Sequence, residues 1–462
     1  MIRLFKNYVP HTVLLLGLVD AICLFLAGEL GWVLRAHQAG LDAGTLPDRL
    51  PQLLTFTATL QVALVAVGAY AAASFRSLRF AAARLAVAVS LGVLGLSLIF
   101  FLVPAVSFWR SNLLYAMLIA GVLLVAVRAA LGRALGSNTF KRRVVVLGAG
   151  ARAARIVELS GQPGVNFVVA GVVAMGEAAP VVAGAVPRDA IPNLAAHVVD
   201  LSAADVVLAL EERRNALPVK DLLRVKTTGV QVVDMSNFLE RETGRIDLAS
   251  VNPSFLIFSD GFTSGQILSS MLKRGFDVAA SVLLLALTLP VILIAALVIK
   301  LESRGPAFYR QHRVGLYNQA FEIVKLRSMR QDAEAGGHAV WAAENDPRVT
   351  RVGRFIRKVR IDELPQAWTV LRGQMSFVGP RPERPQFVSD LEQHLPFYAE
   401  RHMVKPGITG WAQINYPYGA SVDDARHKLE YDLYYAKNYS PFLDLLILLQ
   451  TLRVVLWPEG AR

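Results

Sequence analysis

The stretch FDVAASVLLLALTLPVILIAALVI, residues 276–299, is uncharged apart from Asp277 and carries Pro290 in its interior. A helix of this length can enter the ~30 Å hydrocarbon layer of a membrane. Basic residues flank both ends: Lys273 and Arg274 precede it, and Lys300, Arg304, Arg310 and Arg313 follow it. Basic flanks favour the cytoplasmic side, and proline interrupts a helix. We therefore predict a re-entrant membrane helix that breaks at Pro290 and returns, with a straight crossing as the alternative.

Four more apolar stretches come earlier in the chain, at about 11–34, 53–73, 81–103 and 111–131. Basic residues gather before the first, between the second and third, and after the fourth. The positive-inside rule then predicts a cytoplasmic N-terminus, a four-helix transmembrane bundle over 1–140, and a cytoplasmic remainder. Asp20 and Glu29 lie within the first stretch. An acid at membrane depth is a functional candidate, but we expect bundle-facing packing for Asp20 and an interfacial position for Glu29.

The composition supports a membrane protein: 54% of the residues are hydrophobic and only 18% are charged, and the mean hydropathy is +0.43. The net charge of +12 suits an anionic membrane face or phosphorylated substrates. Because apolar spans are present, we expect no nucleic-acid partner. The single cysteine, Cys23, excludes an intramolecular disulfide.

From residue 141 to 262 the pattern changes to short β-branched runs that alternate with helical segments. FVVAGVVA (167–174), ADVVLAL (204–210) and GVQVVDM (229–235) are typical of buried parallel strands. This pattern predicts a Rossmann-like α/β domain on the cytoplasmic side.

A glycine turn follows the first strand of that domain. Gly148 and Gly150 fit G-x-G-x-x-A between a strand and a helix, where a backbone can approach a pyrophosphate. The supporting acid is missing after the presumed second strand, where only Glu177 lies nearby. Nucleotide binding and simple close packing of the two glycines both remain open.

The segment RVGRFIRKVRIDELPQAWTVLRG, 351–373, concentrates basic residues before two adjacent acids, Asp362 and Glu363. Pro365 predicts that a helix begins there, so the acids would lie at its N-terminus. The helix dipole would keep Asp362 ionised, and an ionised carboxylate can attack phosphorus. Glu363 could hold Mg²⁺. The alternative for Asp362 is an ordinary helix cap.

Proline-stiffened basic loops surround this segment in the sequence. One carries Arg381, Pro382 and Arg384, a second begins at Lys405, and KLRSM (325–329) supplies Lys325 and Arg327. Rigid loops with guanidiniums suit phosphate recognition, because little side-chain entropy is lost on binding. The terminal apolar run 441–457 predicts a helix at the membrane interface or against the dipping helix.

These motifs resemble the bacterial sugar transferase family, the monotopic polyprenyl-phosphate phosphoglycosyl transferases. The resemblance rests on KLRSM, IDELPQ, SFVGPRPERPQFV, RHMVKPGITGWAQINYPYG and YDLYYAKNYS, and it covers about 271–462. It extends to the whole chain in the large subgroup, which adds four N-terminal spans and a Rossmann-like domain. An α-rich monotopic catalytic domain over 263–462, with a re-entrant helix at 276–299, is what the resemblance implies.

The resemblance also implies roles for individual residues. Asp362 would be the nucleophile that takes the sugar-phosphate and expels UMP, and Glu363 the Mg²⁺-associated carboxylate. Pro380-Arg381-Pro382 would contribute to nucleotide binding, and Lys325 and Arg327 would lie near phosphates. Leu289 departs from the family, whose small members carry Ser before the helix-breaking proline; Thr288 could substitute for it.

The implied reaction moves a hexose 1-phosphate, glucose or galactose, from a UDP-sugar to undecaprenyl phosphate at the bacterial inner membrane. It would begin a repeat unit of an exopolysaccharide, capsule or O-antigen. The sequence does not identify the sugar, the polysaccharide or the ligand of the middle domain, and it leaves homo-oligomer formation open.

Two other functions remain as alternatives. A membrane-bound NAD-dependent sugar-nucleotide dehydratase would need a Tyr-x-x-x-Lys pair, and no lysine here has tyrosine four residues before it. A non-enzymatic scaffold for polysaccharide assembly would not require an Asp-Glu pair among arginine-rich loops.

Overall fold

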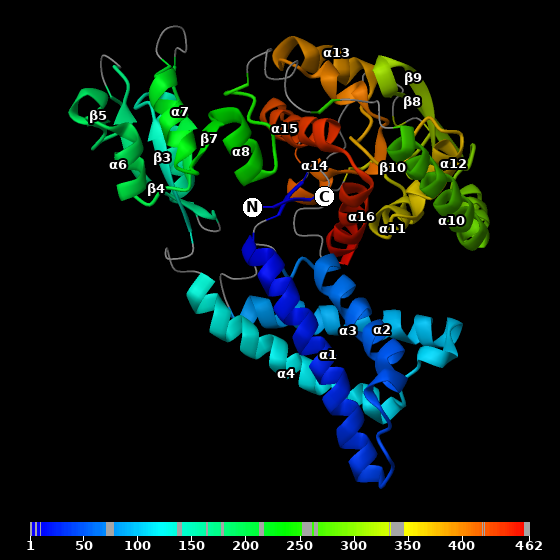
Figure 1. Ribbon diagram of the computed structural model, residues 1–462. Coiled ribbons are helices and arrows are strands. Elements are labelled where there is room, and N and C mark those ends of the chain that lie inside the picture. Colours follow the sequence, from blue (N-terminus) through cyan, green and yellow to red (C-terminus); the bar gives the residue numbers. More distant parts are fainter. Residues whose placement is uncertain are drawn as a thin grey trace. The chain divides into compact units, whose positions relative to one another are not determined.

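The computed structural model describes residues 2–4, 7–9, 11–70, 78–135, 141–162, 165–176, 180–211, 217–251, 261–262, 267–331, 333, 346–417, 419 and 421–456. The chain forms two compact units, Met1–Ser250 and Val251–Arg462 (Figure 1). The first unit holds a helical bundle and an α/β domain. The second unit holds the acidic pair and the basic loops named above, and the Gly148–Gly150 turn lies in the first unit.

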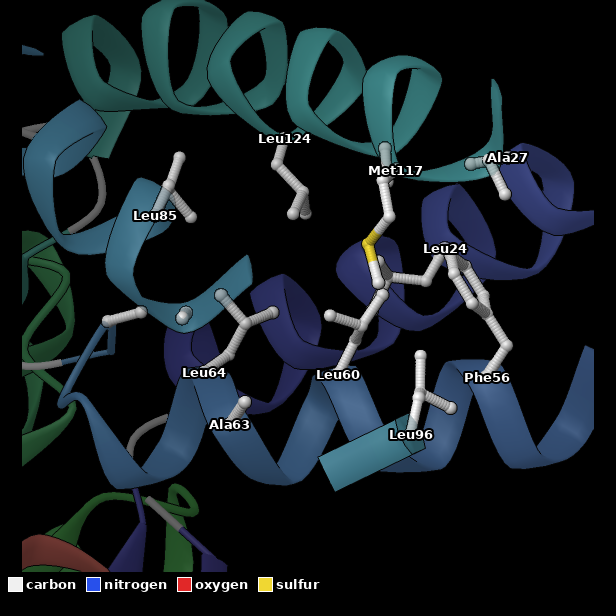
Figure 2. Close-up of a cluster of buried hydrophobic side chains, with 14 of the residues drawn as sticks. Leu24, Ala27, Phe56, Leu60, Ala63, Leu64, Leu85, Leu96, Met117 and Leu124 are labelled. Atoms are coloured by element: carbon white, nitrogen blue, oxygen red, sulfur yellow. The ribbon is translucent and has the colours of Figure 1, made fainter. Parts of the chain in front are cut away.

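The bundle consists of four helices that follow a short hairpin of β1 (Ile2–Leu4) and β2 (Asn7–Val9). The helices are α1 (His11–Ala39), α2 (Leu46–Ala66), α3 (Leu78–Leu102) and α4 (Arg110–Leu135), with a 3-10 turn η2 (Pro104–Val106) before α4. Buried side chains from all four meet in one apolar core, as the labelled residues in Figure 2 show. They include Leu24, Phe56, Leu60, Leu96, Met117 and Leu124.

Three of the four bundle helices are long and apolar enough to cross a membrane, namely α1, α3 and α4. The second predicted stretch, 53–73, differs from the expectation. Its helix, α2, ends at Ala66 and begins as early as Leu46, so it includes Asp48, Arg49 and Pro51. Within the described residues, α2 is therefore outside the set of helices whose length and composition would allow them to cross a membrane.

Buried ion pairs join the bundle helices. The guanidinium of Arg128 in α4 donates to both carboxylate oxygens of Asp20 in α1, at 2.9 and 2.7 Å, and both side chains are inaccessible to solvent. This confirms bundle-facing packing for Asp20. Glu29 accepts from Nε of Arg49 in α2 at 2.8 Å, so it too faces a neighbouring helix. Charges at these depths need such partners, since an unpaired charge in an apolar environment is costly.

The α/β domain is built on a five-stranded parallel sheet with the strand order β5-β4-β3-β6-β7. Its strands are β3 (Arg142–Leu147), β4 (Phe167–Ala174), β5 (Val186–Pro187), β6 (Asp205–Leu208) and β7 (Gln231–Asp234). Its helices are α5 (Ala151–Ser160), α6 (Leu194–Asp200), α7 (Val219–Thr227) and α8 (Met235–Thr243), with the 3-10 turn η4 (Arg188–Ala190). The predicted parallel α/β sheet is confirmed.

Alternate residues of β3 enter different cores. Val144 and Val146 pack with α5 and α8, whereas Val145 and Leu147 pack with α6 and α7. Successive strand side chains point to opposite faces, so a strand covered on both faces must be apolar at every position. The continuous Val-Val-Val-Leu run follows from this packing.

The second unit is rich in helices and has two small sheets. The long helix α10 (Ile267–Glu302) is followed by an antiparallel hairpin of β8 (Phe308–Val314) and β9 (Ala320–Leu326), joined through η5 (Leu316–Asn318). Next come α11 (Arg351–Lys358), η6 (Ile361–Glu363), α12 (Gln366–Leu371), β10 (Ser376–Val378), α13 (Pro385–His394) and η7 (Ala399–Met403). The last elements are β11 (Gly407–Thr409), α14 (Trp411–Asn415), α15 (Val422–Asn438) and α16 (Pro441–Leu456).

Helix α10 is long and apolar enough to cross a membrane, and it runs from Ile267 to Glu302 with Pro290 inside it. The helical assignment is thus not interrupted at Pro290, where the sequence led us to expect a break. Many of its apolar side chains are exposed, among them Leu283, Leu287 and Leu293. The re-entrant path through the membrane stays a prediction.

Candidate active site

The acidic pair lies in η6, a single 3-10 turn between α11 and α12. Arg360 has a φ of 58° at the start of this turn, a left-handed conformation that non-glycine residues rarely adopt. It reverses the chain after α11, so that Asp362 is brought toward the hairpin strand β9. A helix begins at Pro365 as predicted: Pro365 is the N-cap residue of α12 (Gln366–Leu371). Asp362 and Glu363 lie in the 3-10 turn directly before this helix.

Glu363 is held by cations from three parts of the unit. Nζ of Lys325 in β9 lies 3.0 Å from its Oε1, and Nη2 of Arg381 donates to the same oxygen at 3.1 Å. Nη1 of Arg360 lies 3.9 Å from Oε2. Burial alone would raise the pKa of Glu363, but the charges of Arg381 and Lys325 outweigh it and hold the pKa well below its ordinary value. Glu363 is ionised at neutral pH.

Asp362 has the opposite environment. Its side chain is buried, and within the described part of the chain its Oδ1 has no hydrogen-bond partner. Burial, with the neighbouring charge of Glu363, raises the pKa of Asp362. This shift is opposite to the one we expected from a helix N-terminus, because desolvation of Asp362 outweighs the dipole of the short helix α12. No side chain caps α12, so the alternative of an ordinary cap is wrong.

The two proline-stiffened loops, far apart in the sequence, lie side by side. Strands β10 and β11 pair in parallel, and the amide of Gly379 donates to Thr409 O at 2.9 Å. A Cβ at Gly379 would lie 2.2 Å from Lys405 O. Only glycine allows this approach of the two backbones. The pairing brings the loop of Arg381 and the loop of Lys405 together, which the sequence did not show.

The other predicted phosphate-binding residues have different surroundings. Arg327 is buried, and its guanidinium donates to the carbonyls of Arg304 and Ser303, each at 2.8 Å, at the C-terminal end of α10. Arg384 is the N-cap residue of α13. Burial lowers the pKa of Lys405, and its charged neighbours are Arg274, Asp277 and Lys273 of α10. The structure thus brings Lys325 and Arg381 to the acids, while phosphate roles for Arg327, Arg384 and Lys405 stay predictions.

The acidic pair could supply only part of the ligands that Mg²⁺ needs. In the described residues no group of three His, Cys, Asp or Glu side chains could hold a metal ion by itself. Mg²⁺ commonly uses one or two carboxylates and completes its shell with phosphate oxygens and water. The ionised Glu363 could supply such a carboxylate to a metal that arrives with a diphosphate, which leaves Oδ1 of Asp362 without a ligand role.

The glycine turn of the α/β domain is filled by the chain itself. Oε1 of Glu211, which follows β6, accepts the amide of Arg152 at the start of α5 at 3.0 Å. A Cβ at Gly150 would lie 2.7 Å from the same oxygen, and one at Gly148 would lie 2.5 Å from Ala209 O. Close backbone packing accounts for Gly148, whereas Gly150 meets the end of the Glu211 side chain. Nucleotide binding at this turn stays a prediction. Glu177 lies outside the described residues.

Sequence reasoning missed the buried side chains behind the Arg381 loop. Arg401 is buried and donates to Asp432 at 2.7 and 3.1 Å. Both lie inside quoted motifs, but their pairing is a tertiary contact between η7 and α15, and no spacing rule in a single sequence indicates it.

The protein has helices long and apolar enough to cross a membrane and a cluster of acidic and basic side chains in its second unit. Comparison with known proteins gives the family. Residues 268–458 match the family described as Bacterial sugar transferase. The UDP-N-acetylgalactosamine-undecaprenyl-phosphate N-acetylgalactosaminephosphotransferase of Aeromonas hydrophila is 44% identical over 241 residues, 52% of this chain and 56% of that protein. The Undecaprenyl-phosphate glucose phosphotransferase of Komagataeibacter xylinus is 45% identical over 194 residues, 41% of this chain and 36% of that protein.

A third relative is matched almost completely. The Uncharacterized sugar transferase EpsL of Bacillus subtilis is 43% identical over 194 residues, which is 41% of this chain and 90% of that protein. The chain therefore belongs to the bacterial sugar transferase family, and the resemblance read from its motifs is confirmed. The matched part spans about half of the Aeromonas relative and about a third of the Komagataeibacter relative.

Proposed function

We propose that the protein transfers a sugar 1-phosphate from a UDP-sugar to undecaprenyl phosphate and releases UMP. One observation carries this proposal: the Asp362 carboxylate is buried and has an unpartnered Oδ1, beside Glu363, which Lys325 and Arg381 hold. A desolvated carboxylate without hydrogen bonds is a better nucleophile than a solvated one, and the adjacent cations suit a diphosphate. The names of the relatives support the acceptor and the class of reaction.

The reaction would proceed as two displacements at one phosphorus. Oδ1 of Asp362 attacks the phosphorus that bears the sugar, an Asp–O–P bond forms, and the bond to the bridging oxygen breaks so that UMP leaves with that oxygen. An oxygen of the lipid phosphate then attacks the same phosphorus and the aspartyl bond breaks. The carboxylate is restored and the product is a lipid diphosphate sugar. Each step exchanges one P–O bond for another and needs no oxidant or reductant.

The cations around the acidic pair would stabilise the charge that develops on the phosphoryl oxygens. Arg381 and Lys325 lie within hydrogen-bonding distance of Glu363, and the charges of Lys325, Arg357 and Arg360 act on Asp362. Glu363 would hold Mg²⁺ together with the diphosphate, and the metal would neutralise further negative charge on the donor. The low-dielectric surroundings of Asp362 make each of these interactions stronger than in water.

Both ends of α10 contact the same unit, which supports the re-entrant path as part of the proposal. Near its start, Nζ of Lys273 lies 2.6 Å from Asp444 and donates to Val378 O at 3.0 Å. Near its end, Glu302 accepts the amide of Val352 at 3.1 Å. A straight crossing would place these ends on opposite sides of a ~30 Å hydrocarbon layer. A dipping helix keeps both at the cytoplasmic face of the inner membrane, where the water-soluble donor and the lipid phosphate can meet.

The donor sugar is a hexose or an N-acetylhexosamine on this proposal. We expected glucose or galactose from the sequence, and the relatives' names print glucose and N-acetylgalactosamine. The product would begin the repeat unit of an exopolysaccharide, capsule or O-antigen.

The decisive experiment traps the covalent intermediate. The purified full chain is incubated with each of a panel of UDP-sugars without acceptor, and peptides are mapped by mass spectrometry. We expect a phospho-sugar on the peptide that contains Asp362 and one UMP released for each adduct, and undecaprenyl phosphate should discharge the adduct. UMP release with no adduct, or with an adduct on another residue, would contradict the mechanism.

A further inference from the structure

The loop that carries Arg381 is fixed through its backbone carbonyl groups. From residue 380 to 383, between β10 and α13, each carbonyl accepts a hydrogen bond from elsewhere in the unit. The donors are the amide of Gly407 on Pro380 (2.9 Å), the guanidinium of Arg401 on Arg381 (3.0 Å), the guanidinium of Arg313 on Pro382 (3.0 Å) and the amide of Val314 on Glu383 (2.9 Å). The backbone of the loop is therefore set by side chains and strands on both sides of it.

Of these four donors, Arg401 contacts the carbonyl of Arg381, whose own side chain contacts Glu363. Its Nη2 donates to Arg381 O at 3.0 Å and to Asp432 at 2.7 Å, and its Nη1 donates to the hydroxyl of Tyr398 at 2.8 Å. Arg401 is 5% exposed, Asp432 2% and Tyr398 4%. Because Arg401 is buried, its contact with the Arg381 carbonyl is the link by which it would act on a substrate held by Arg381.

A buried ion pair of this kind contributes little to stability on its own, because removing two charges from water offsets their attraction. The guanidinium of Arg401, however, is planar and carries several N–H donors, so it holds several acceptors in one fixed geometry. Here those acceptors come from η7, α15 and the Arg381 loop. The pair thus fixes a backbone position whose side chain reaches the acidic site.

We propose that Arg401, oriented by Asp432 and Tyr398, is a positioning residue that fixes Arg381 for binding the diphosphate of the donor. The inference rests on the proposed function, since it requires a UDP-sugar that Arg381 contacts. Holding Arg381 in advance lowers the entropy that is lost when the diphosphate binds.

The test combines Arg401→Lys with Arg381→Ala in a double-mutant cycle. Lysine keeps the charge beside Asp432 but cannot donate to Asp432, Tyr398 and the Arg381 carbonyl together. We expect Arg401→Lys to raise the donor KM, and the Kd of UDP measured by calorimetry, roughly tenfold. In the Arg381→Ala background the same change should alter both by less than about twofold, because it acts through the missing side chain.

The matched control is Arg241→Lys in the α/β domain. Arg241 has a 7% exposed side chain and donates to the buried Asp205 at 2.7 Å, so the change removes a similar buried guanidinium outside the candidate site. We expect it to lower the melting temperature without changing the donor KM. If Arg401→Lys does not fold, Tyr398→Phe removes only one acceptor and should show the same non-additivity with Arg381→Ala at a smaller amplitude.

The outcomes separate this inference from the proposed function. A wild-type protein that releases UMP from no UDP-sugar contradicts the proposed function before any variant is compared. An active wild type whose donor KM is unchanged in the folded Arg401 and Tyr398 variants overturns the inference alone. Equal shifts with and without Arg381 overturn it as well, since they show a general loss of structure.

Discussion

Nζ of Lys325 lies 3.0 Å from Oε1 of Glu363. This ion pair joins the hairpin strand β9 to the turn η6, directly beside Asp362, the proposed nucleophile. The side chain of Lys325 is partly buried, with 19% of it exposed, and burial lowers its pKa although Glu363 acts against this shift. The ion pair of Lys325 with Glu363 holds the carboxylate of Glu363 among cations. It leaves the other, Asp362, buried without a hydrogen bond at Oδ1.

Replacing Asp362 should separate stability from activity. Asp362→Asn removes the proposed nucleophile, and we expect UMP release to fall by about three orders of magnitude or more. The melting temperature should stay the same or rise, because a buried charge without a hydrogen bond is unfavourable in the folded state. UMP release and thermal unfolding measured on the same preparation check both parts. Turnover near the wild-type rate would remove Asp362 from the mechanism.

The raised pKa of Asp362 predicts a pH dependence. The folded chain holds this proton to a higher pH than the unfolded chain, whose aspartate titrates near about 3.9. Its contribution to the free energy of unfolding therefore falls as pH rises from that value through the folded pKa. Activity should rise over the same window, because attack requires the ionised form. We expect kcat/KM for the donor to show an acid limb above the ordinary aspartate value.

Neighbouring charges should move that acid limb in opposite directions. Glu363 raises the pKa of Asp362 and Lys325 lowers it. Glu363→Gln should therefore shift the limb to lower pH, and Lys325→Met should shift it to higher pH, in single-turnover UMP release. Shifts in the same direction would show that the limb belongs to another group.

Metal removal tests the role of Glu363. We expect EDTA to stop UMP release and Mg²⁺ to restore it, and Glu363→Gln to require a higher Mg²⁺ concentration for half-maximal rate. Glu322→Gln is the control, since Glu322 forms an exposed pair with Arg310 on the hairpin and should leave the Mg²⁺ dependence unchanged. Full activity in EDTA would count against a metal.

Cysteine labelling tests the path of α10. In a Cys23→Ser background, cysteines placed at Leu268 and Ser303 should react from the same side of sealed inner-membrane vesicles. The reason is that both ends of the helix contact one polar unit. A membrane-impermeant maleimide applied to vesicles of either orientation gives the measurement. Labelling from opposite sides would establish a crossing.

The Asp20–Arg128 pair predicts a stability effect inside the bundle. Asp20→Asn leaves Arg128 buried without its anion, which should cost about 3–5 kcal/mol and lower the melting temperature in detergent. The double replacement Asp20→Leu with Arg128→Met should recover most of that loss, because no charge remains unpaired. A single variant as stable as wild type would mean that water or lipid reaches Arg128.

Much of the organisation could be read from local patterns. Hydropathy located α1, α3, α4 and α10, and β-branched runs located the parallel strands, because burial on both faces requires apolar residues at every position. The same reasoning placed a span at 53–73, where α2 ends at Ala66. Hydropathy does not detect Asp48, Arg49 and Pro51 as part of the helix, because the start of α2 is set by polar end signals: a capping box of Thr45 with Asp48 and a proline in the first turn.

By itself the sequence determined the family, the membrane association and the acidic pair, since each follows from residue types at fixed spacing. Only the tertiary structure decided that Asp362 is buried with a raised pKa, that the Arg381 and Lys405 loops pair through β10 and β11, and that Arg401 holds Arg381. It also filled the Gly148–Gly150 turn with Glu211. The physical reason is that desolvation and contacts between distant residues set these properties, and neither is encoded in local spacing.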